Sequence, residues 1–206
     1  MNSIILLGSG GHCKSCIDVI EKSFSHKIKG IIDKPNLVNK EFMGYRILGD
    51  DNQLQDHFQE NDLGLVCVGQ IKSPAVRIRL FNLLLEKGIG IAIVKSIHSV
   101  ISDHTKINMG TIVMHNSVIN SGTVIGANCI INTNSTIEHD VIINDHCHIS
   151  TGAILNGGVE VGRGSFVGSG AIIKQGIKIG EDVIVSAGEV VLKDIPSNTT
   201  YKTIQN

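Results

Sequence analysis

The sequence predicts an α/β Rossmann-like half domain at the N-terminus, followed by a parallel β-helix. Up to about residue 95, short apolar runs alternate with helical patterns, as in a parallel sheet covered by helices. From Ile101 to Val191 an aliphatic residue recurs at every sixth position, which is the hexapeptide repeat of a β-helix. An aliphatic core also fits the composition, since aromatic residues make up only 3% and glycines number 23. We therefore expect two domains, residues 1–95 and 96–206.

The N-terminal domain is predicted to contain three strands and two helices in β–loop–α–β order. We expect strands at Ser3–Leu7, Ile28–Ile32 and Leu63–Val68, and helices at Cys13–Lys22 and Pro74–Lys87. Proline in the first turn of the second helix and Gly88 just after its end are residues that helix termini favour. This unit is about half the size of a full dinucleotide-binding domain.

The C-terminal domain is predicted from sixteen aliphatic residues in one uninterrupted frame. They are Ile101, Ile107, Val113, Ile119, Ile125, Ile131, Ile137, Ile143, Ile149, Leu155, Val161, Val167, Ile173, Ile179, Val185 and Val191. Small residues usually stand two positions earlier, so the aliphatic residues should face inward and the small residues should lie at the corners. Three hexads form one triangular coil, so about five coils are expected, with no long loop and a stop at Asp194–Pro196. The flat faces and open end of such a prism favour a symmetric trimer.

Composition and charge exclude several classes of protein. The net charge is −1 and charged residues make up 18%, so no nucleic-acid partner is expected. The sequence contains no apolar run of 18 residues and no basic region of a signal peptide, so we expect no membrane segment and a cytoplasmic location. Five cysteines, an odd number, argue against a disulfide framework. Cys13 and Cys16 form a C-x-x-C pair, but no thioredoxin-like context follows, so we favour small helix residues over a redox motif.

Three histidines, His139, His146 and His148, stand close together in the repeat. Strand alternation places all three outside the core, so the alternative to a functional role is a solvated or trimer-lining position. His139 lies between Glu138 and Asp140, and a neighbouring carboxylate raises imidazole basicity and fixes its tautomer. A general base and a structural interface histidine remain equal alternatives. No metal is expected, because no cysteine or carboxylate set completes a tetrahedral spacing.

The turn GSGGH follows the first strand and begins the first helix. Gly10 and Gly11 permit close approach of the backbone to a phosphate at the helix N-terminus. Cys13 replaces the third glycine of a dinucleotide fingerprint, so we expect a nucleotide diphosphate, and a plain tight turn is the alternative. Asp33, next to Lys34, ends the second strand, where a carboxylate can hydrogen-bond a ribose or a base.

Four segments together resemble the NeuD/PglD group of bacterial sugar acetyltransferases, over nearly the whole chain. They are GSGGHCKSCIDVIE at the start, IIDKP after the second strand, INTNSTIEHDVIINDHCHISTGAIL in the repeat and SGAIIKQGIKIGEDVIVSAGEVVLKDIP near the end. The resemblance implies a homotrimeric left-handed β-helix that uses acetyl-CoA, with active sites between neighbouring prisms. The tail IPSNTTYKTIQN departs from the G-x-P-A-K-like turn that is usual in this group.

The resemblance also implies roles for single residues. His139 matches the catalytic histidine, and Asp140 matches the acidic residue that raises its basicity. Acetyl-CoA contacts match His148 near the thioester and Gly157, Ser169 and Ala187 along the prism. Sugar-nucleotide contacts match Gly10, Gly11, His12, Asp33 and Lys34, and Asn132 matches an asparagine near the active site. His139 would deprotonate the acceptor, a backbone N–H or His148 would stabilise the oxyanion, and Cys147 would take no part.

The implied reaction is acetyl transfer to the amino group of a nucleotide-linked 4-amino-deoxysugar in bacterial glycan or lipopolysaccharide biosynthesis. Two alternatives stay open from the sequence. One is a sialic-acid O-acetyltransferase, and the other is a non-catalytic hexapeptide partner of a sugar-biosynthesis enzyme.

Overall fold

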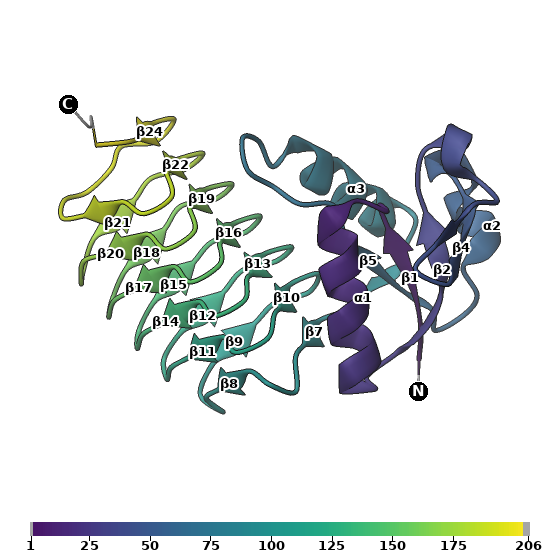
Figure 1. Cartoon of the computed structure of the whole chain (residues 1–206), viewed down its shortest axis with the longest axis horizontal. Helices are drawn as coiled ribbons and strands as arrows, with labels where there is room; N and C mark the ends of the chain where they lie inside the picture. The colour runs from purple at the N-terminus through teal and green to yellow at the C-terminus, as the bar shows by residue number, and fades with distance from the viewer. Residues whose placement is uncertain (1, 204–206) are drawn as a thin grey trace.

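The computed structural model describes residues 2–203 and contains an α/β domain beside a β-helix (Figure 1). The α/β domain is built on a six-stranded sheet in the order β3-β4-β2-β1-β5-β6. Its strands are β1 (Ser3–Leu7), β2 (Lys27–Ile32), β3 (Glu41–Phe42), β4 (Tyr45–Gly49), β5 (Leu63–Val66) and β6 (Gly90–Ile91). Its helices are α1 (Gly11–Ser23), α2 (Leu54–His57) and α3 (Ala75–Glu86), with short 3₁₀ turns η1 (Pro35–Leu37) and η2 (Asp51–Gln53).

The three predicted strands and both predicted helices are confirmed. The central strand β1 is buried on both of its faces. Ile4 and Leu6 pack in one apolar cluster with α1, and Ile5 and Leu7 pack in another with α3. The sequence pattern missed β3, β4, α2 and β6. The first two form an antiparallel pair at the sheet edge, where β3 is only two residues long and partly exposed.

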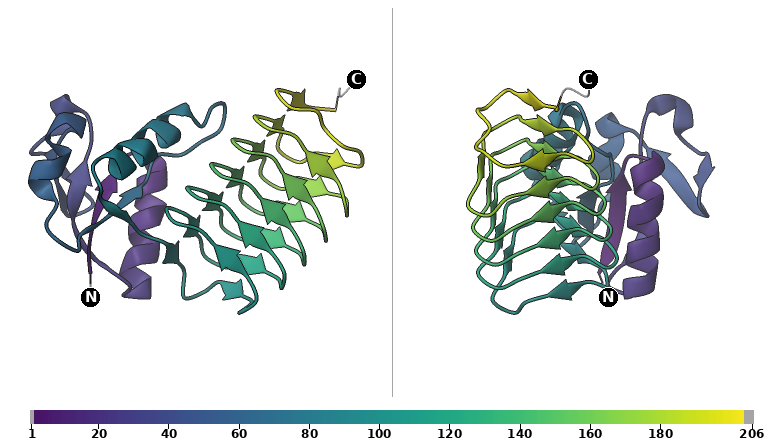
Figure 2. Two further views of the ribbon diagram at one scale, coloured as in Figure 1. Left: turned by 180° about the vertical axis from the view of Figure 1, so that it is seen from behind. Right: turned by 60° about the vertical axis from the view of Figure 1, so that its left-hand side comes forward.

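The β-helix has three faces, each a parallel sheet of short strands (Figure 2). Paired strands lie eighteen residues apart, except at the C-terminal end of the first face, where Ile184 pairs with Thr200, sixteen residues later. Face I contains β7 (Val94–Lys95), β10 (Ile112–Val113), β13 (Ile130–Ile131), β16 (His148–Ile149), β19 (Phe166–Val167), β22 (Ile184–Val185) and β24 (Thr200–Tyr201). Face II contains β8 (Val100–Ile101), β11 (Val118–Ile119), β14 (Thr136–Ile137), β17 (Ile154–Leu155), β20 (Ile172–Ile173) and β23 (Val190–Val191). Face III contains β9 (Lys106–Ile107), β12 (Val124–Ile125), β15 (Ile142–Ile143), β18 (Glu160–Val161) and β21 (Lys178–Ile179).

The predicted frame is confirmed at every strand from β8 to β23, because each of the sixteen aliphatic residues is the second residue of a strand. These side chains form one inner core with the small residues. Thr111, Ser117 and Ser165 are fully buried, and their hydroxyls donate to backbone carbonyls fifteen residues later at 2.8 Å. The small residues therefore satisfy corner carbonyls as well as saving space.

The corners have a second six-residue period that sequence inspection missed. Three residues after each inward aliphatic from Ile107 to Val185, the backbone adopts positive φ, at glycine or at Asn116, Asn128, Asn134, Asp140, His146 and Asp182. Only glycine, asparagine and similar short polar residues adopt this left-handed conformation at low cost. Asp140 and His146 therefore occupy turn positions that the repeat itself imposes.

The predicted stop at Asp194–Pro196 is wrong. Ile195 bridges to Ile179, and β24 pairs with β22, so the tail adds part of another coil. Ile195 follows Val191 by four residues instead of six, and this shift explains why a strict count ended too early. Its side chain is nevertheless buried in the inner core.

The α/β domain packs on face I at its N-terminal end (Figures 1 and 2). The outward residues Val94, Ile112 and Ile130 are fully buried in one cluster with residues of α1. Arg77 of α3, only 1% exposed, donates to Val66 O and Val68 O in the α/β domain and to the backbone and side-chain oxygens of Asn128 in the β-helix. This contact fixes the two domains against each other. Within residues 2–203 none of the helices has the length and apolarity that crossing a bilayer requires.

Candidate active site

His139 and Asp140 form a hydrogen-bonded pair on an exposed corner between faces II and III. Their side chains are 57% and 72% exposed, and His139 Nδ1 lies 2.8 Å from Asp140 Oδ2. A carboxylate accepts, so Nδ1 carries the proton in the neutral ring and Nε2 keeps its lone pair. Asp140 reaches the ring because its backbone is left-handed, with φ of 59°. The pair thus presents Nε2 as a base toward solvent.

Two glycines leave room for this pair. A Cβ at Gly157, one coil further on, would lie 2.6 Å from His139 Nε2 and 2.7 Å from Cε1. A Cβ at Gly122, one coil earlier, would overlap Asp140 Oδ1. Glu138, the other flanking carboxylate, instead accepts from Asn120 Nδ2 at 2.9 Å. Of the two carboxylates beside His139 in the sequence, the structure therefore pairs only Asp140 with the ring.

His148 lies on face I under the α/β domain and is 6% exposed. Its Nδ1 lies 2.6 Å from Gln70 O, and its Nε2 lies 3.0 Å from Asn132 Nδ2. The Phe166 ring packs edge-on against it, with 5.1 Å between ring centroids. Burial lowers the pKa of His148 to about 4, although the hydrogen bond to Gln70 O acts in the opposite direction. The ring is therefore neutral at physiological pH.

His146 is also 6% exposed, so a solvated or trimer-lining position is the wrong expectation for both His146 and His148. Its Nδ1 lies 3.0 Å from Asn128 Nδ2, and its ring packs edge-on against Phe81 of α3. Burial lowers the pKa of His146 as well. Strand parity placed both rings outside the prism, but the α/β domain covers that side of it.

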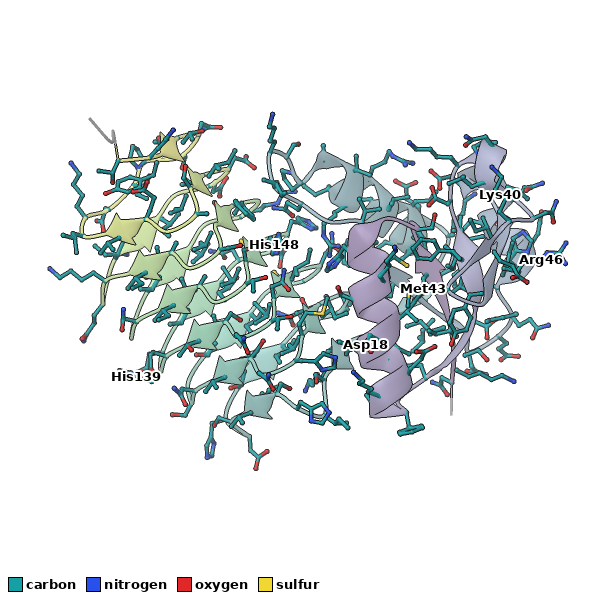
Figure 3. The ribbon with its side chains drawn as sticks, viewed as in Figure 1. Asp18, Lys40, Met43, Arg46, His139 and His148 are labelled. Carbon is teal, nitrogen blue, oxygen red and sulfur yellow. The ribbon has the colours of Figure 1, made fainter. Side chains whose placement is uncertain are left out.

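The three histidines do not converge. Figure 3 shows His139 on the edge of the β-helix remote from the α/β domain and His148 on the side that faces it. Across residues 2–203, no three His, Cys, Asp or Glu side chains are arranged to hold a metal ion. Cys13 and Cys16 are buried in α1, and the five cysteines of the described chain are free thiols.

A cavity of about 890 Å³ lies at the C-terminal ends of β1 and β2. Gly10, Gly11 and His12 line it at the N-terminus of α1, together with Asp33 and Lys34. Helix N-termini attract anions, and the first turn of α1 contains no acidic residue. The five residues that the sequence predicted for a sugar nucleotide therefore surround one cavity.

The walls of this cavity show how the turn is held. Asp33 Oδ2 accepts from both the backbone N–H and the hydroxyl of Ser9, and Oδ1 accepts from the Lys34 N–H at 2.7 Å. Arg79 of α3 and Asp51 also line the cavity, and they pair with each other at 2.7 Å. Arg79 was missed from the sequence because a helical pattern does not show which side of α3 faces the cavity.

The remaining predicted residues lie at a third location, the corner after face I. Asn132 contacts His148 there, and Ser169 and Ala187 are exposed on successive coils. The Ser169 hydroxyl pairs with that of Ser150 at 2.9 Å. The structure therefore brings His139, Asp140 and Gly157 together at one corner and gathers His148, Asn132, Ser169 and Ala187 along another.

Comparisons with known families match both domains. Residues 3–84 match the PglD N-terminal domain, residues 122–157 the bacterial transferase hexapeptide (six repeats), and residues 158–193 the hexapeptide repeat of succinyl-transferase. No curated protein sequence matches the chain.

Several solved structures share the whole architecture. PerB from Caulobacter crescentus, in complex with CoA and GDP-perosamine, is 28% identical with a TM-score of 0.87, over 96% of this chain and 92% of that one. The acetyltransferase domain of PglB from Neisseria gonorrhoeae, in complex with acetyl coenzyme A, is 25% identical with a TM-score of 0.88, over 96% and 95%. WeeI from Acinetobacter baumannii is 25% identical with a TM-score of 0.84, over the same shares of the two chains.

Proposed function

We propose that this chain, a PglD N-terminal domain joined to a left-handed β-helix of transferase hexapeptide repeats, is an acetyl-CoA-dependent sugar acetyltransferase. The resemblance to the NeuD/PglD group that the sequence motifs indicate is confirmed by the family matches and by the solved relatives. The acceptor we propose is the amino group of a nucleotide-linked 4-amino-deoxysugar, made for bacterial glycan or lipopolysaccharide biosynthesis. PerB, which was solved with CoA and GDP-perosamine, supports this class of acceptor.

The observation that carries the proposal is the pair formed by His139 and Asp140. Asp140 holds the proton on Nδ1, so Nε2 is the atom that removes a proton from the acceptor amine. The amine nitrogen forms a bond to the thioester carbonyl carbon, and the bond from that carbon to sulfur breaks. The proton passes through His139 to the departing thiolate. Because this transfer is direct, Cys147, which is buried in the inner core, takes no part.

The nucleotide is assigned to the 890 Å³ cavity of the α/β domain. The N–H groups of Gly10, Gly11 and His12 would bind the diphosphate at the N-terminus of α1. Asp33 and Lys34 would contact the ribose or the base from the end of β2. We therefore assign residues 1–95 to the sugar nucleotide and residues 96–206 to acetyl-CoA.

A homotrimer is proposed because the catalytic residues lie on different corners of one prism. His139 would meet His148, Ser169 and Ala187 only if the corner after face II of one subunit approached the corner after face I of its neighbour. Face II supports this arrangement, since its outward residues Val100, Ile172 and Val190 are 66%, 38% and 50% exposed. Sedimentation equilibrium should give three times the 22.1 kDa chain mass.

A cytoplasmic location is part of the proposal. The five cysteines of the described chain are free thiols, which suits a reducing compartment.

The proposed function is tested by acetyl-CoA turnover, followed as thiol release, on UDP-, CMP-, GDP- and dTDP-linked amino sugars and on free sialic acid. Turnover on an amino-sugar nucleotide would support N-acetyl transfer. Turnover on sialic acid alone would establish an O-acetyltransferase. Silence in protein that does not bind CoA would favour the non-catalytic partner.

A further inference from the structure

We infer that Cys16 of α1 is held as a thiolate, and that this anion is the counter-ion of the buried Arg77 where the two domains meet. Neither side chain takes part in the proposed acetyl transfer, so this charge pair stands or falls independently of the proposed function. A thiolate that takes up a proton loses its charge, so the pair makes the contact between the domains sensitive to pH.

Arg77 is a buried cation without a carboxylate partner. The four hydrogen bonds that its Nη1 and Nη2 donate all end on uncharged oxygens of the backbone or of the Asn128 amide. Its Nε is buried and has no hydrogen-bond acceptor among residues 2–203. None of the ion pairs in the same part of the chain includes Arg77. A buried charge is costly unless an opposite charge compensates it, so an anion is expected nearby.

The groups beside Arg77 that can become anions are thiols. They belong to Cys16 of α1, Cys67 after β5 and Cys129 of the β-helix. Cys67 Sγ donates to a backbone carbonyl at 3.6 Å and Cys129 Sγ donates to another at 3.2 Å, so both sulfurs carry their protons. No carbonyl oxygen in the described chain accepts a hydrogen bond from Cys16, although other cysteines donate to several. Cys16 is therefore the sulfur that is free to be the anion.

The surroundings of Cys16 favour the thiolate. Burial by itself raises the pKa of Cys16, but hydrogen bonds with Cys67 and His12 and the positive charges of His12 and Arg77 outweigh it and lower the pKa to about 5. Burial, with Cys13 and Cys16 as neighbours, raises the pKa of Cys67 well above its usual value, so Cys67 stays a thiol. The rest of the cluster around Cys16, where α1 packs on face I, is apolar. The ionisable groups around Cys16 are thus two cations and two other sulfurs.

The direction of the pH dependence follows from the charge of Cys16 in the folded and unfolded states. In the unfolded chain the pKa of Cys16 has its ordinary value of 9.0, so the sulfur is a thiol at neutral pH. In the folded protein it is a thiolate, so folding releases a proton. The stability that Cys16 contributes is complete above pH 9.0 and is lost as the pH falls toward 5. Within this window each pH unit changes the unfolding equilibrium constant by about tenfold.

The first test is the ultraviolet absorbance of thiolate in the reduced full-length protein at pH 7. We expect a thiolate signal in the folded protein that disappears on unfolding in urea at the same pH, and that is missing from Cys16→Ser. Cys147→Ser is the control and should keep the signal, because serine already occupies the matching corner position at Ser135 and Ser165. A wild-type protein without the signal would overturn the assignment, and so would a signal that persists in Cys16→Ser.

The second test replaces the sulfur by a carboxylate or by a hydroxyl group. Cys16→Asp restores a negative charge beside Arg77 and Cys16→Ser does not, so at pH 7 the aspartate variant should unfold at the same or a higher urea concentration. Cys13, one turn earlier on α1 and equally buried, is the matched position. Cys13→Asp should unfold at a much lower urea concentration than Cys13→Ser, because a buried carboxylate without a cation is costly. Equal losses at the two positions would mean that Cys16 is an ordinary buried thiol.

The third test is the unfolding equilibrium constant at pH 7 and pH 8, measured by urea denaturation. Relative to Cys16→Ser, the constant of the wild-type protein should fall by about tenfold over this interval. His146 and His148, whose pKa values are lowered by burial, are neutral in both states at these pH values and cancel in the comparison. The same change in the two proteins would mean that Cys16 releases no proton on folding. If Cys16→Ser does not fold, the absorbance of the wild-type protein and the stability of Cys16→Asp still decide whether the thiolate exists.

Discussion

The imidazole of His139 lies directly over Gly157, one coil further along the β-helix. A methyl group at residue 157 would come within 2.6 Å of Nε2, the atom that we propose removes the acceptor proton. The backbone of Gly157 is not left-handed, so alanine would be tolerated there by the chain itself. Gly157 therefore keeps space for the ring, which is a different role from the acetyl-CoA contact that the resemblance implied.

Gly157→Ala is expected to displace the imidazole without unfolding the protein. Misplacement of a catalytic group by about 1 Å can lower the rate 10²-fold, so we expect a loss in kcat of that order and a small change in the KM for acetyl-CoA. Gly176→Asn is the control, because Gly176 lies on the same corner with φ of 71° and nothing within 4 Å of the added Cβ. A higher KM with unchanged kcat would show that Gly157 acts as a contact to acetyl-CoA instead.

A second prediction concerns the kcat of variants at His139 and Asp140. His139→Ala should lower kcat by about 10²–10⁴-fold, the usual contribution of a general base. Asp140→Asn should also lower kcat, and the double variant should be no slower than His139→Ala, because the two residues act as one unit. Steady-state kinetics at saturating acetyl-CoA would measure all three variants.

Asp182→Asn is the matched control for Asp140→Asn. Asp182 also has a left-handed backbone and also lies over a glycine, Gly164, but on a different corner. The kcat of Asp182→Asn should equal that of the wild-type protein. Equal losses in the two variants would mean that the effect of Asp140 is on the corner fold and not on the imidazole.

Arg77 is predicted to be essential for stability. Its guanidinium is buried and donates to four oxygens across the two domains. Arg77→Met would leave those oxygens without their donor, so we expect the free energy of unfolding to fall by about 3–5 kcal/mol, measured by urea denaturation. Arg77→Lys should not rescue it, because an ammonium cannot reach both domains as a planar fork does.

Arg79→Met provides the comparison on the same helix. Arg79 is 59% exposed and pairs with Asp51, and exposed ion pairs contribute about 0–1 kcal/mol. Its loss should therefore change the free energy of unfolding by less than about 1 kcal/mol. If Arg77→Met were no more destabilising than this variant, the contact between the domains would not depend on Arg77.

The β-helix could be predicted from sequence because its information is local and repeated. Each hexad carries its own inward aliphatic residue, so a departure from the six-residue spacing at one position, such as Ile195, does not affect the prediction of the other coils. That Gly10, Gly11 and Asp33 line one cavity could be predicted for a similar reason, since they follow the ends of neighbouring strands β1 and β2. In both cases residues that are close together in the sequence determine where the side chains lie.

The surroundings of His146 and His148 could not be predicted in this way. Strand parity tells which residues point out of a prism, but not which face another domain will cover. One available signal was the column Val94, Ile112 and Ile130, because outward aliphatic residues in three successive coils indicate a covered face. His148 continues that column by one coil, and its burial follows from it.

The burial of His148 leads to the last prediction, which concerns how the free energy of unfolding depends on pH. The pKa is about 4 in the folded protein and about 6.5 in the unfolded chain. Above pH 6.5 both states hold a neutral ring, so the pH has no effect through this residue. As the pH falls from 6.5 toward 4, only the unfolded state takes up the proton, and stability is lost by about 1.4 kcal/mol per pH unit.

Urea denaturation at pH 7.5 and pH 5 would measure this effect. Between these values the wild-type protein should lose about 2 kcal/mol more than His148→Gln, which has no proton to bind at this position. The lowered pKa of His146 acts in the same direction in both proteins and cancels in the difference. An equal loss in the two proteins would mean that the His148 ring is already charged or solvated in the folded state, and a charged ring could not accept the hydrogen bond that orients Asn132.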